Sequence, residues 1–252
     1  TLDFGTSFTD EEPVIDVIIR RFPVSLQFGI VSLIMIYLIC IPLGILKAVK
    51  DGQPFDYTSS FVLFVMYSII PLMLGILLKT FFANESFFDW FPVLGLHSDL
   101  EVYESLSFWG KVGDRVHHFI LPLCCYMIGS FTVLTLLMKN SLLEVIKLDY
   151  IRTARAKGLD ENKVIFKHAL RNALIPIATG LSSFLGVMLA GSIIIEKIFE
   201  LDGIGLLSFN AVLQRDYNVV MALIFLQSLL LLIGRIVSDI LYMVIDPRID
   251  FT

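Results

Sequence analysis

The stretch VSLQFGIVSLIMIYLICIPLGIL, residues 24–46, contains no Asp, Glu, Lys or Arg. A helix rises about 1.5 Å per residue, so a run of this length can cross a hydrocarbon core about 30 Å thick. Strands of outer-membrane barrels are about 10 residues long and alternate apolar with polar side chains, which this run does not do. We therefore predict a transmembrane helix over residues 24–46.

Four further apolar runs follow along the chain. The predicted spans are residues 59–82, 119–138, 174–195 and 218–245. The last span carries Arg235 and Asp239 one helical turn apart, a spacing at which opposite charges can pair. Only 17% of the 252 residues are charged, whereas about a quarter are charged in a typical soluble domain. The predicted fold class is an all-α membrane protein with five transmembrane helices.

The segments that connect these spans differ in their content of Lys and Arg. Eleven lie in residues 47–58, 139–171 and 246–252, and seven lie in residues 1–23, 79–118 and 196–217. Because cytoplasmic loops carry the excess of Lys and Arg, the first set is predicted to be cytoplasmic. Residues 1–23 then form an external N-terminal segment with an interfacial helix, residues 24–252 form the transmembrane domain, and the C-terminus is inside. An external N-terminus suggests that a sixth, N-terminal span is missing from this chain.

The sequence also excludes several function classes. No Gly-x-x-x-x-Gly-Lys-Ser/Thr motif occurs, so the chain does not bind a nucleotide by that route. Four of the five spans lack the carboxylates and histidines that ion-coupled transporters place at membrane depth. We predict a transport protein that is not an enzyme and that depends on a separate motor. The first alternative is a channel or secondary transporter that needs no ATPase, and a more distant one is a purely structural membrane anchor.

No metal site is predicted. The three cysteines all fall inside predicted spans, at spacings that fit neither a disulfide framework nor a zinc site. His117 and His118 are adjacent in the sequence, which is a poor geometry for joint chelation.

One long basic segment interrupts the apolar pattern: LDYIRTARAKGLDENKVIFKHALRNALIP, residues 148–176. Asp149 is a suitable N-cap for a short helix over 150–157, and Gly158 suits the left-handed conformation that ends a helix. Asp160 can cap a second helix over 161–175. That helix has a basic stripe of Lys163, Lys167 and Arg171 and an apolar side of Ile165, Phe166, Ala169 and Leu170. From the residues alone, the first helix either docks into a groove of another protein or belongs to a positive loop that only fixes the topology or attracts anionic lipid.

Seven stretches together carry a resemblance to a known family. They are DYIRTARAKGL…VIFKHALRNALIP, DFGTSF, RFPVSLQFG, IPLGILKAVK, AGSIIIEKIFELDGIG, AVLQRDYNVV and DILYMVIDPRIDF. The chain resembles, over essentially its whole length, the permease subunits of type I ATP-binding-cassette (ABC) importers in the oligopeptide/dipeptide/nickel branch. Within that branch it is most similar to permeases associated with microcin C and oligopeptide uptake.

The resemblance implies a multi-pass subunit of a bacterial inner membrane, surrounded by lipid, with six spans when complete. Its implied partners are a second homologous permease, two cytoplasmic ATPase subunits that bind the ATP, and an external substrate-binding protein that delivers peptide. No cofactor within the chain and no nucleic-acid partner are implied. Import would proceed by alternating access, with a peptide or, alternatively, a nickel chelate as the substrate.

The resemblance also assigns roles to residues. Residues 139–173 would form the cytoplasmic coupling loop. Its contacts with the ATPase would come from Tyr150, Arg152, Thr153, Ala154, Arg155, Ala156, Lys157 and Gly158. On the outer side, Glu196, Asp202 and Gly203 are expected to contact the binding protein or to cap an external gate. The alternative for Glu196 is a solvated carboxylate at a helix end. Many relatives have Pro-Gly where this chain has Asp202-Gly203, which leaves the local turn open.

Overall fold

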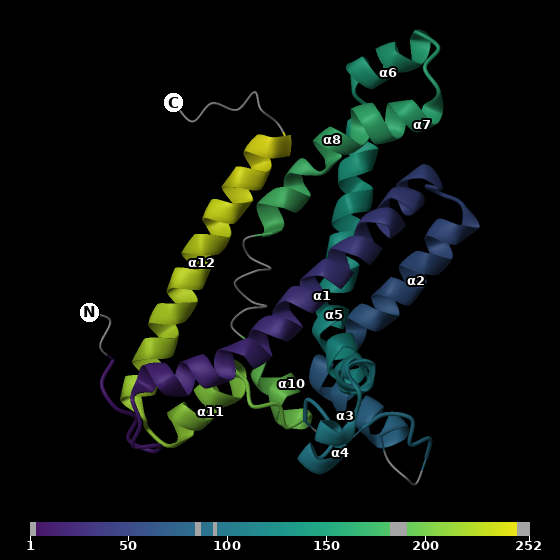
Figure 1. Cartoon of the computed structure of the whole chain (residues 1–252). Coiled ribbons are helices and arrows are strands. Elements are labelled where there is room, and N and C mark those ends of the chain that lie inside the picture. Colours follow the sequence, from purple (N-terminus) through teal and green to yellow (C-terminus); the bar gives the residue numbers. More distant parts are fainter. Residues whose placement is uncertain (1–3, 84–86, 93–94, 182–190, 246–252) are drawn as a thin grey trace. The chain divides into compact units, whose positions relative to one another are not determined.

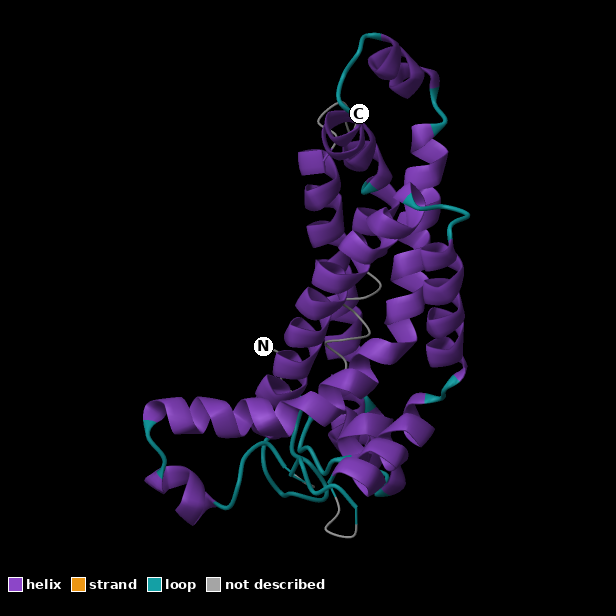
Figure 2. Cartoon of the chain, turned by 90° about the vertical axis from the view of Figure 1, so that its right-hand side faces the viewer, coloured by secondary structure: helices purple, strands orange, loops and turns teal. Residues whose placement is uncertain are grey.

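The regular structure of the chain is helical. A computed structural model of residues 1–252 describes residues 4–83, 87–92, 95–181 and 191–245 (Figure 1). Within these residues Figure 2 shows helices and loops, and the only β-type pairing found there is an isolated bridge between Thr6 and Pro13. The helices are α1 (Val14–Val49), α2 (Pro54–Ser68), α3 (Pro71–Phe82), α4 (Leu100–Ser105), α5 (Phe108–Ile146), α6 (Asp149–Ala156), α7 (Glu161–Lys163), the π-helix η1 (Val164–Ala169), α8 (Leu170–Ala173), α10 (Ile193–Ile198), α11 (Ile204–Leu213) and α12 (Tyr217–Ile245). The predicted all-α class is confirmed.

Three described helices, α1, α5 and α12, are long and apolar enough to cross a membrane, and α2 with α3 makes a fourth candidate as a broken span. α12 covers Tyr217–Ile245 where the sequence predicts 218–245. The predicted span over 174–195 includes residues 182–190, which lie outside the described residues. On either side of them, residues 175–181 are helical and α10 begins at Ile193.

Two predicted boundaries differ from the structure. α1 already begins at Val14, so residues 14–23 belong to the same continuous helix as the first predicted span and do not form a separate helix. Val14 and Val17 are fully buried against α11 and α12, and this burial extends the helix beyond the charge-free run. The helix predicted over 59–82 is broken between α2 and α3. The cause is Pro71, because a proline excludes the preceding residue from the helical region, and Ile70 is extended with ψ 133°.

The chain forms two compact units, each assembled from segments that are distant in sequence. Unit 1 contains residues 1–33, 69–129 and 187–230, and unit 2 contains residues 34–68, 130–186 and 231–252.

Two hydrophobic clusters lie among the described residues of unit 1. The first joins the start of α1 to α11 and α12 through Val14, Val17, Ile18, Ile204, Leu207, Ala211, Val219, Ala222 and Leu223. The second surrounds Phe28, whose ring stacks on Phe119 with 4.1 Å between centroids and on Tyr126 with 5.6 Å. Aromatic stacking of this kind adds to the free energy of burial, by about 0.5–1.5 kcal/mol per pair.

Unit 2 is held together by side chains that donate to the backbone of a neighbouring helix. Thr132 on α5 donates to the Leu63 carbonyl of α2 at 2.8 Å, and Ser238 on α12 donates to the Ala178 carbonyl at 2.7 Å. Small residues and hydroxyls at helix contacts are typical of membrane proteins, because lipid cannot pair with a polar group.

Candidate functional site

α6 lies in the basic segment and is a helix of eight residues. Its N-cap is Leu148, which has no side-chain acceptor, so the predicted capping by Asp149 is wrong. Asp149 instead lies in the first turn, where the helix dipole favours an anion. Its carboxylate is 3.4 Å from Arg152, but both side chains are exposed and the pair adds little to stability.

Gly158 ends this helix in the predicted left-handed conformation, with φ +75°. Its N–H donates to the Arg155 carbonyl at 2.9 Å and closes the turn. A Cβ at this position would meet nothing within 4 Å, so only the backbone conformation opposes a larger residue. Two residues farther on, Asp160 accepts the N–H of Asn162 at 3.2 Å, which confirms its predicted role as an N-cap.

Arg155 and Glu161 form a bidentate ion pair across this turn. Arg155 Nε donates to Glu161 Oε2 at 3.0 Å, and Nη2 donates to Oε1 at 2.6 Å. The hydrogen bonds from Arg155 hold the pKa of Glu161 below its usual value, and the pKa of Arg155 is raised by the same bonds. The two parallel hydrogen bonds favour one geometry of the loop between α6 and α7, although both side chains are exposed.

α6 is anchored on one side and free on the other. Ile151 is fully buried, and the Tyr150 hydroxyl accepts a hydrogen bond from Asn172 Nδ2 at 2.7 Å. α6 also packs against η1. Figure 1 shows α6 and α7 near each other at the upper right. Of the eight predicted coupling residues, seven are exposed and only Ala154 is half-buried. On this exposed face, short side chains such as Thr153 and Ala156 lie between longer cationic ones. Such an uneven surface is suited to packing in a groove of another protein.

The second helix of the basic segment is not the continuous α-helix predicted over 161–175. A π-helix, η1, separates α7 from α8. A π turn contains more residues than an α turn and rotates the following side chains relative to the α pattern. Ile165 and Ala169 are buried as the apolar side requires, but Phe166, predicted on the same side, is 57% exposed.

On unit 1, Glu196 is fully buried, which rules out the solvated alternative. Its Oε1 accepts the hydroxyls of Ser25 and Tyr126 at 2.8 and 3.3 Å and the N–H of Ser192 at 3.2 Å. Its Oε2 accepts the N–H of Leu206 at 2.8 Å. A buried carboxylate needs such donors because it has lost its water. The carboxylate therefore connects α1, α5, α10 and α11.

Glu196 also replaces a missing helix cap. The N-cap of α11 is Gly203, which has no side chain. Two of the first N–H groups of α11 are satisfied by other elements: Ile204 donates to Ser25 Oγ at 2.7 Å, and Leu206 donates to Glu196. The positive end of the α11 dipole favours the carboxylate at this place.

Three glycines of AGSIIIEKIFELDGIG make room for this arrangement. A Cβ on Gly191 would lie 2.5 Å from Glu196 Oε1, and one on Gly203 would lie 2.6 Å from Glu196 Cδ. A Cβ on Gly205 would lie 2.7 Å from the Ile193 nitrogen. We name this group of Ser25, Tyr126, Gly191, Ser192, Glu196, Gly203 and Gly205 the Glu196 cluster.

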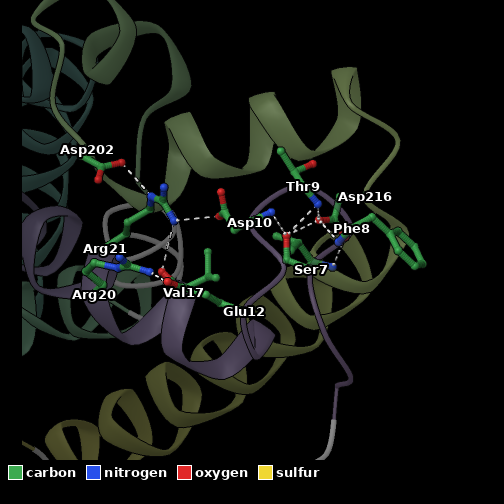
Figure 3. Close-up of polar contacts among 11 residues, drawn as sticks. Ser7, Phe8, Thr9, Asp10, Glu12, Val17, Arg20, Arg21, Asp202 and Asp216 are labelled. Carbon is green, nitrogen blue, oxygen red and sulfur yellow. Dashed lines mark hydrogen bonds and ion pairs between the residues drawn. The ribbon is translucent and has the colours of Figure 1, made fainter.

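Asp202 lies next to the cluster and remains accessible. Its Oδ1 accepts Arg21 Nε at 2.7 Å while its side chain is 65% exposed (Figure 3). Arg21 also faces Asp10, with 3.7 Å between charged atoms. The structure thus brings together Glu196, Asp202 and Gly203, with the first buried beneath the others.

The start of the chain is tied to the start of α12 (Figure 3). The Ser7 hydroxyl and the Phe8 N–H donate to Asp216 Oδ2 at 2.5 and 2.9 Å, and Val219 N–H donates to Oδ1 at 3.3 Å. Burial raises the pKa of Asp216, but these hydrogen bonds outweigh it and lower the pKa overall. Beside this contact is a small polar cavity of ≈ 110 Å³, to which Arg21 also contributes.

Sequence reasoning missed the partners of these carboxylates. Ser25 and Tyr126 lie within runs that were interpreted as uniform apolar spans, and Ser7 and Asp216 are separated by more than 200 positions. The spacing of glycines around Glu196 was the available signal.

The described parts of the chain contain no group of three metal-ligating side chains. Within the same residues no ion pair joins Arg235 to Asp239, so of the two interpretations of these charges, an ion pair or snorkelling anchors at the end of the helix, the structure does not show the first.

Comparison with known proteins identifies the family. Residues 40–251 match the family model described as the binding-protein-dependent transport system inner membrane component. The chain is 45% identical over 250 residues to the peptidoglycan transport system permease protein of Agrobacterium fabrum, covering 99% of this chain and 68% of that protein. It is 37% identical over 250 residues to an oligopeptide transport system permease protein of Bacillus subtilis, covering 99% and 76%. It is 34% identical over 261 residues to the dipeptide transport system permease protein of Escherichia coli, covering 98% and 76%.

A solved structure supports the fold. The inward-facing methionine ABC transporter MetNI superimposes with a TM-score of 0.68, covering 92% of this chain and 97% of the MetNI chain at 17% sequence identity. The matched family, the relatives and the apolar helices agree with the resemblance drawn from the sequence. This chain therefore belongs to the family of binding-protein-dependent transport system inner membrane components, and it is a multi-pass permease subunit with the type I ABC importer fold.

Proposed function

We propose that this permease carries peptides, or compounds built like peptides, inward across the cytoplasmic membrane as part of an ATP-driven importer. The relatives that match nearly the whole chain are named for peptidoglycan, oligopeptide and dipeptide transport, and these cargoes share amide-linked amino acids. The observation that carries the proposal is α6, an exposed cationic helix anchored at Ile151. A nickel chelate is the alternative cargo in the same branch.

The proposed mechanism is alternating access, driven through α6. A motor shifts the equilibrium between two conformations only through contacts that differ between them. The exposed residues of α6 and Gly158 would bind an ATPase subunit, and the Arg155–Glu161 pair would keep the loop rigid enough to move as one body. The proposed assembly contains this subunit, a second permease, two ATPases and an external binding protein. The N-terminal segment of this chain would be outside and its C-terminus inside.

The outer residues would have separate roles in this assembly. Glu196 is fully buried and cannot itself touch a binding protein. Asp202 is exposed beside Arg21 and is the better candidate for that contact. We assign Glu196 the role of a positioning residue, which holds the turn that presents Asp202.

One experiment tests the role of α6. Cysteine at Thr153, in membranes that also contain the ATPases, should crosslink to an ATPase subunit, and the yield should change when ATP hydrolysis is arrested. The matched control is cysteine at Gln53, which is exposed on the α1–α2 turn. Absence of any crosslink from Thr153→Cys, with a functional importer in the same membranes, would refute the coupling role.

A second experiment tests the cargo. The purified complex is reconstituted into vesicles with its binding protein, and uptake of labelled di-, tri- and oligopeptides is measured with and without ATP. ATP-dependent peptide uptake is expected. Flux without ATP would support a channel or secondary transporter, and ATP-dependent uptake of nickel chelates alone would support the other cargo.

A further inference from the structure

Unit 2 contains a buried cluster of charges whose residues belong neither to α6 nor to the Glu196 cluster. Lys47 at the end of α1 is fully buried, and Asp56 near the start of α2 is 5% exposed. The third member is Lys139 on α5, whose side chain is 13% exposed. Buried charges are rare and costly, and these lie on three different helices.

The Asp56 carboxylate bridges the two lysines. Asp56 Oδ1 is 3.0 Å from Lys47 Nζ, and Asp56 Oδ2 accepts a hydrogen bond from Lys139 Nζ at 2.7 Å. Lys47 Nζ directs its hydrogen bonds to the Asp56 carbonyl and to the hydroxyls of Ser59 and Ser60, at 3.0, 2.7 and 2.8 Å. All three ammonium protons are therefore used, and Asp56 Oδ1 is held by charge alone.

Close helix packing next to the charges limits independent movement. A Cβ on Gly44 of α1 would lie 2.6 Å from Met138 Cβ and 2.8 Å from the Thr135 carbonyl of α5. Gly44 is one turn before Lys47, and Met138 precedes Lys139. The cluster therefore lies next to a point of close approach between α1 and α5, and Asp56 connects α2 to these two helices.

A chain of contacts connects this cluster to α6. Tyr150 on α6 accepts from Asn172 on α8 at 2.7 Å. The next residue, Ala173, accepts the Ser141 hydroxyl of α5 through its carbonyl at 2.8 Å. Ser141 is two residues from Lys139. All of these residues belong to unit 2.

We infer that Asp56, with Lys47 and Lys139, is a positioning device that makes the α1–α2 hairpin and α5 respond to α6 as one body. The inference rests on the proposed function, because it supposes that α6 is moved by an ATPase. A buried ion pair is a poor source of stability compared with apolar side chains of the same size. It is well suited to fixing one arrangement of three helices, because a displaced partner leaves an unpaired charge. Coupling between distant sites requires a continuous set of such contacts.

The test compares two Asp→Asn variants in the reconstituted importer. Asp56→Asn removes the bridge, whereas Asp51→Asn removes an exposed carboxylate that pairs with the same Lys139 at 2.8 Å. ATP hydrolysis and import of labelled trialanine are measured in the same vesicles. We expect Asp56→Asn to lower the peptide imported per ATP by roughly tenfold, and Asp51→Asn to change it less than about twofold. An unchanged ratio in Asp56→Asn would overturn the inference.

A second readout does not depend on the cargo. In a background without native cysteines, Gln53 on the exposed α1–α2 turn is replaced by cysteine and its maleimide labelling is compared with and without arrested ATP hydrolysis. The nucleotide-dependent change in labelling should be present in the parent and lost in Asp56→Asn, while Thr153→Cys still crosslinks to the ATPase. A parent that shows this change but imports no peptide refutes the proposed cargo alone. Persistence of the change in Asp56→Asn refutes the positioning role alone.

A second variant covers the case in which Asp56→Asn does not assemble. Lys47→Met combined with Asp56→Leu removes the two most buried charges together, and Lys139 keeps its ion pair with Asp51. This variant should assemble and hydrolyse ATP, with the same fall in peptide imported per ATP. A parental ratio in this variant overturns the inference, and so does failure of both variants to assemble, because the cluster would then serve folding and not transmission.

Discussion

Replacing Glu196 with alanine tests the Glu196 cluster most directly. The substitution removes the acceptor of four hydrogen bonds at a site with no solvent exposure. Glu196→Gln is the informative companion, because it keeps the shape and removes the charge.

The loss in free energy of unfolding caused by Glu196→Ala depends on which of the four donors keep a partner. Ser192 N–H keeps a partner, since it also lies 3.1 Å from the Tyr126 hydroxyl, and the Ser25 and Tyr126 hydroxyls can rotate. Leu206 N–H has no second acceptor among the hydrogen bonds of the described residues. An unsatisfied buried donor costs about 1–3 kcal/mol, and loss of a charged acceptor adds to it. Removal of the buried charge offsets part of this, so we expect Glu196→Ala to destabilise unit 1 by about 2–4 kcal/mol.

Glu196→Gln should cost about half as much as Glu196→Ala, because one end of the amide still accepts while its NH₂ group faces a donor. The assay is thermal unfolding of the complex in mild detergent, followed by peptide uptake at a temperature where each variant is folded. Glu101→Ala, an exposed carboxylate on α4, is the control and should behave like the parent.

If Glu196→Ala unfolds at the parental temperature and imports peptide at the parental rate, the cluster has no positioning role. Normal unfolding combined with lost uptake would mean that the carboxylate serves transport, through the turn that presents Asp202, and not the stability of unit 1.

Three further predictions follow from single positions. Gly158→Val should reduce import per ATP while leaving the spans inserted, because a β-branched residue at φ +75° costs at least about 1–2 kcal/mol. Gly158→Asn should retain import, since asparagine tolerates this conformation. Equal import by the two variants would contradict the role of the turn. Because the pKa of Asp216 is lowered on folding, its contribution to stability is present above the usual pKa of aspartate and is lost as the pH falls through the lowered value. Limited proteolysis of the N-terminal segment should therefore increase below that pH, and Asp216→Asn should show the increase even at neutral pH; a protease pattern independent of pH would refute this. Gly44→Ala should destabilise the complex by about 1–3 kcal/mol through its clash with Met138, while Gly129→Ala, which meets nothing within 4 Å, should be neutral in the same unfolding assay.

The part of the site that could be predicted from the sequence is the part built from neighbours along the chain. The short helix before Gly158, the left-handed glycine and the cap at Asp160 each depend on residues within one or two turns. Capping and turn chemistry act over that range, so the sequence contains the whole cause. The same local reasoning failed at Asp149, because the helix begins one residue earlier than predicted and its N-cap, Leu148, has no capping side chain.

The part that could not be predicted depends on residues that meet only after folding. Glu196 and Asp202 could be singled out from one segment, but nothing in that segment shows that the first is buried and the second exposed. That difference comes from Ser25 on α1, 171 positions away, whose hydroxyl binds both Glu196 and the start of α11.

By itself, the sequence determined that this is a helical membrane protein, where the long apolar helices α1, α5 and α12 run and which segment carries the exposed basic helix. These properties follow from transfer of apolar side chains into lipid and from local helix chemistry, which sum over neighbouring residues. Only the tertiary structure decided that the helix expected over 59–82 is broken, that Glu196 caps α11 and that Asp56 bridges Lys47 and Lys139. The physical reason is that a buried charge must find its partner in three dimensions, and the identity of that partner depends on how helices distant in sequence pack.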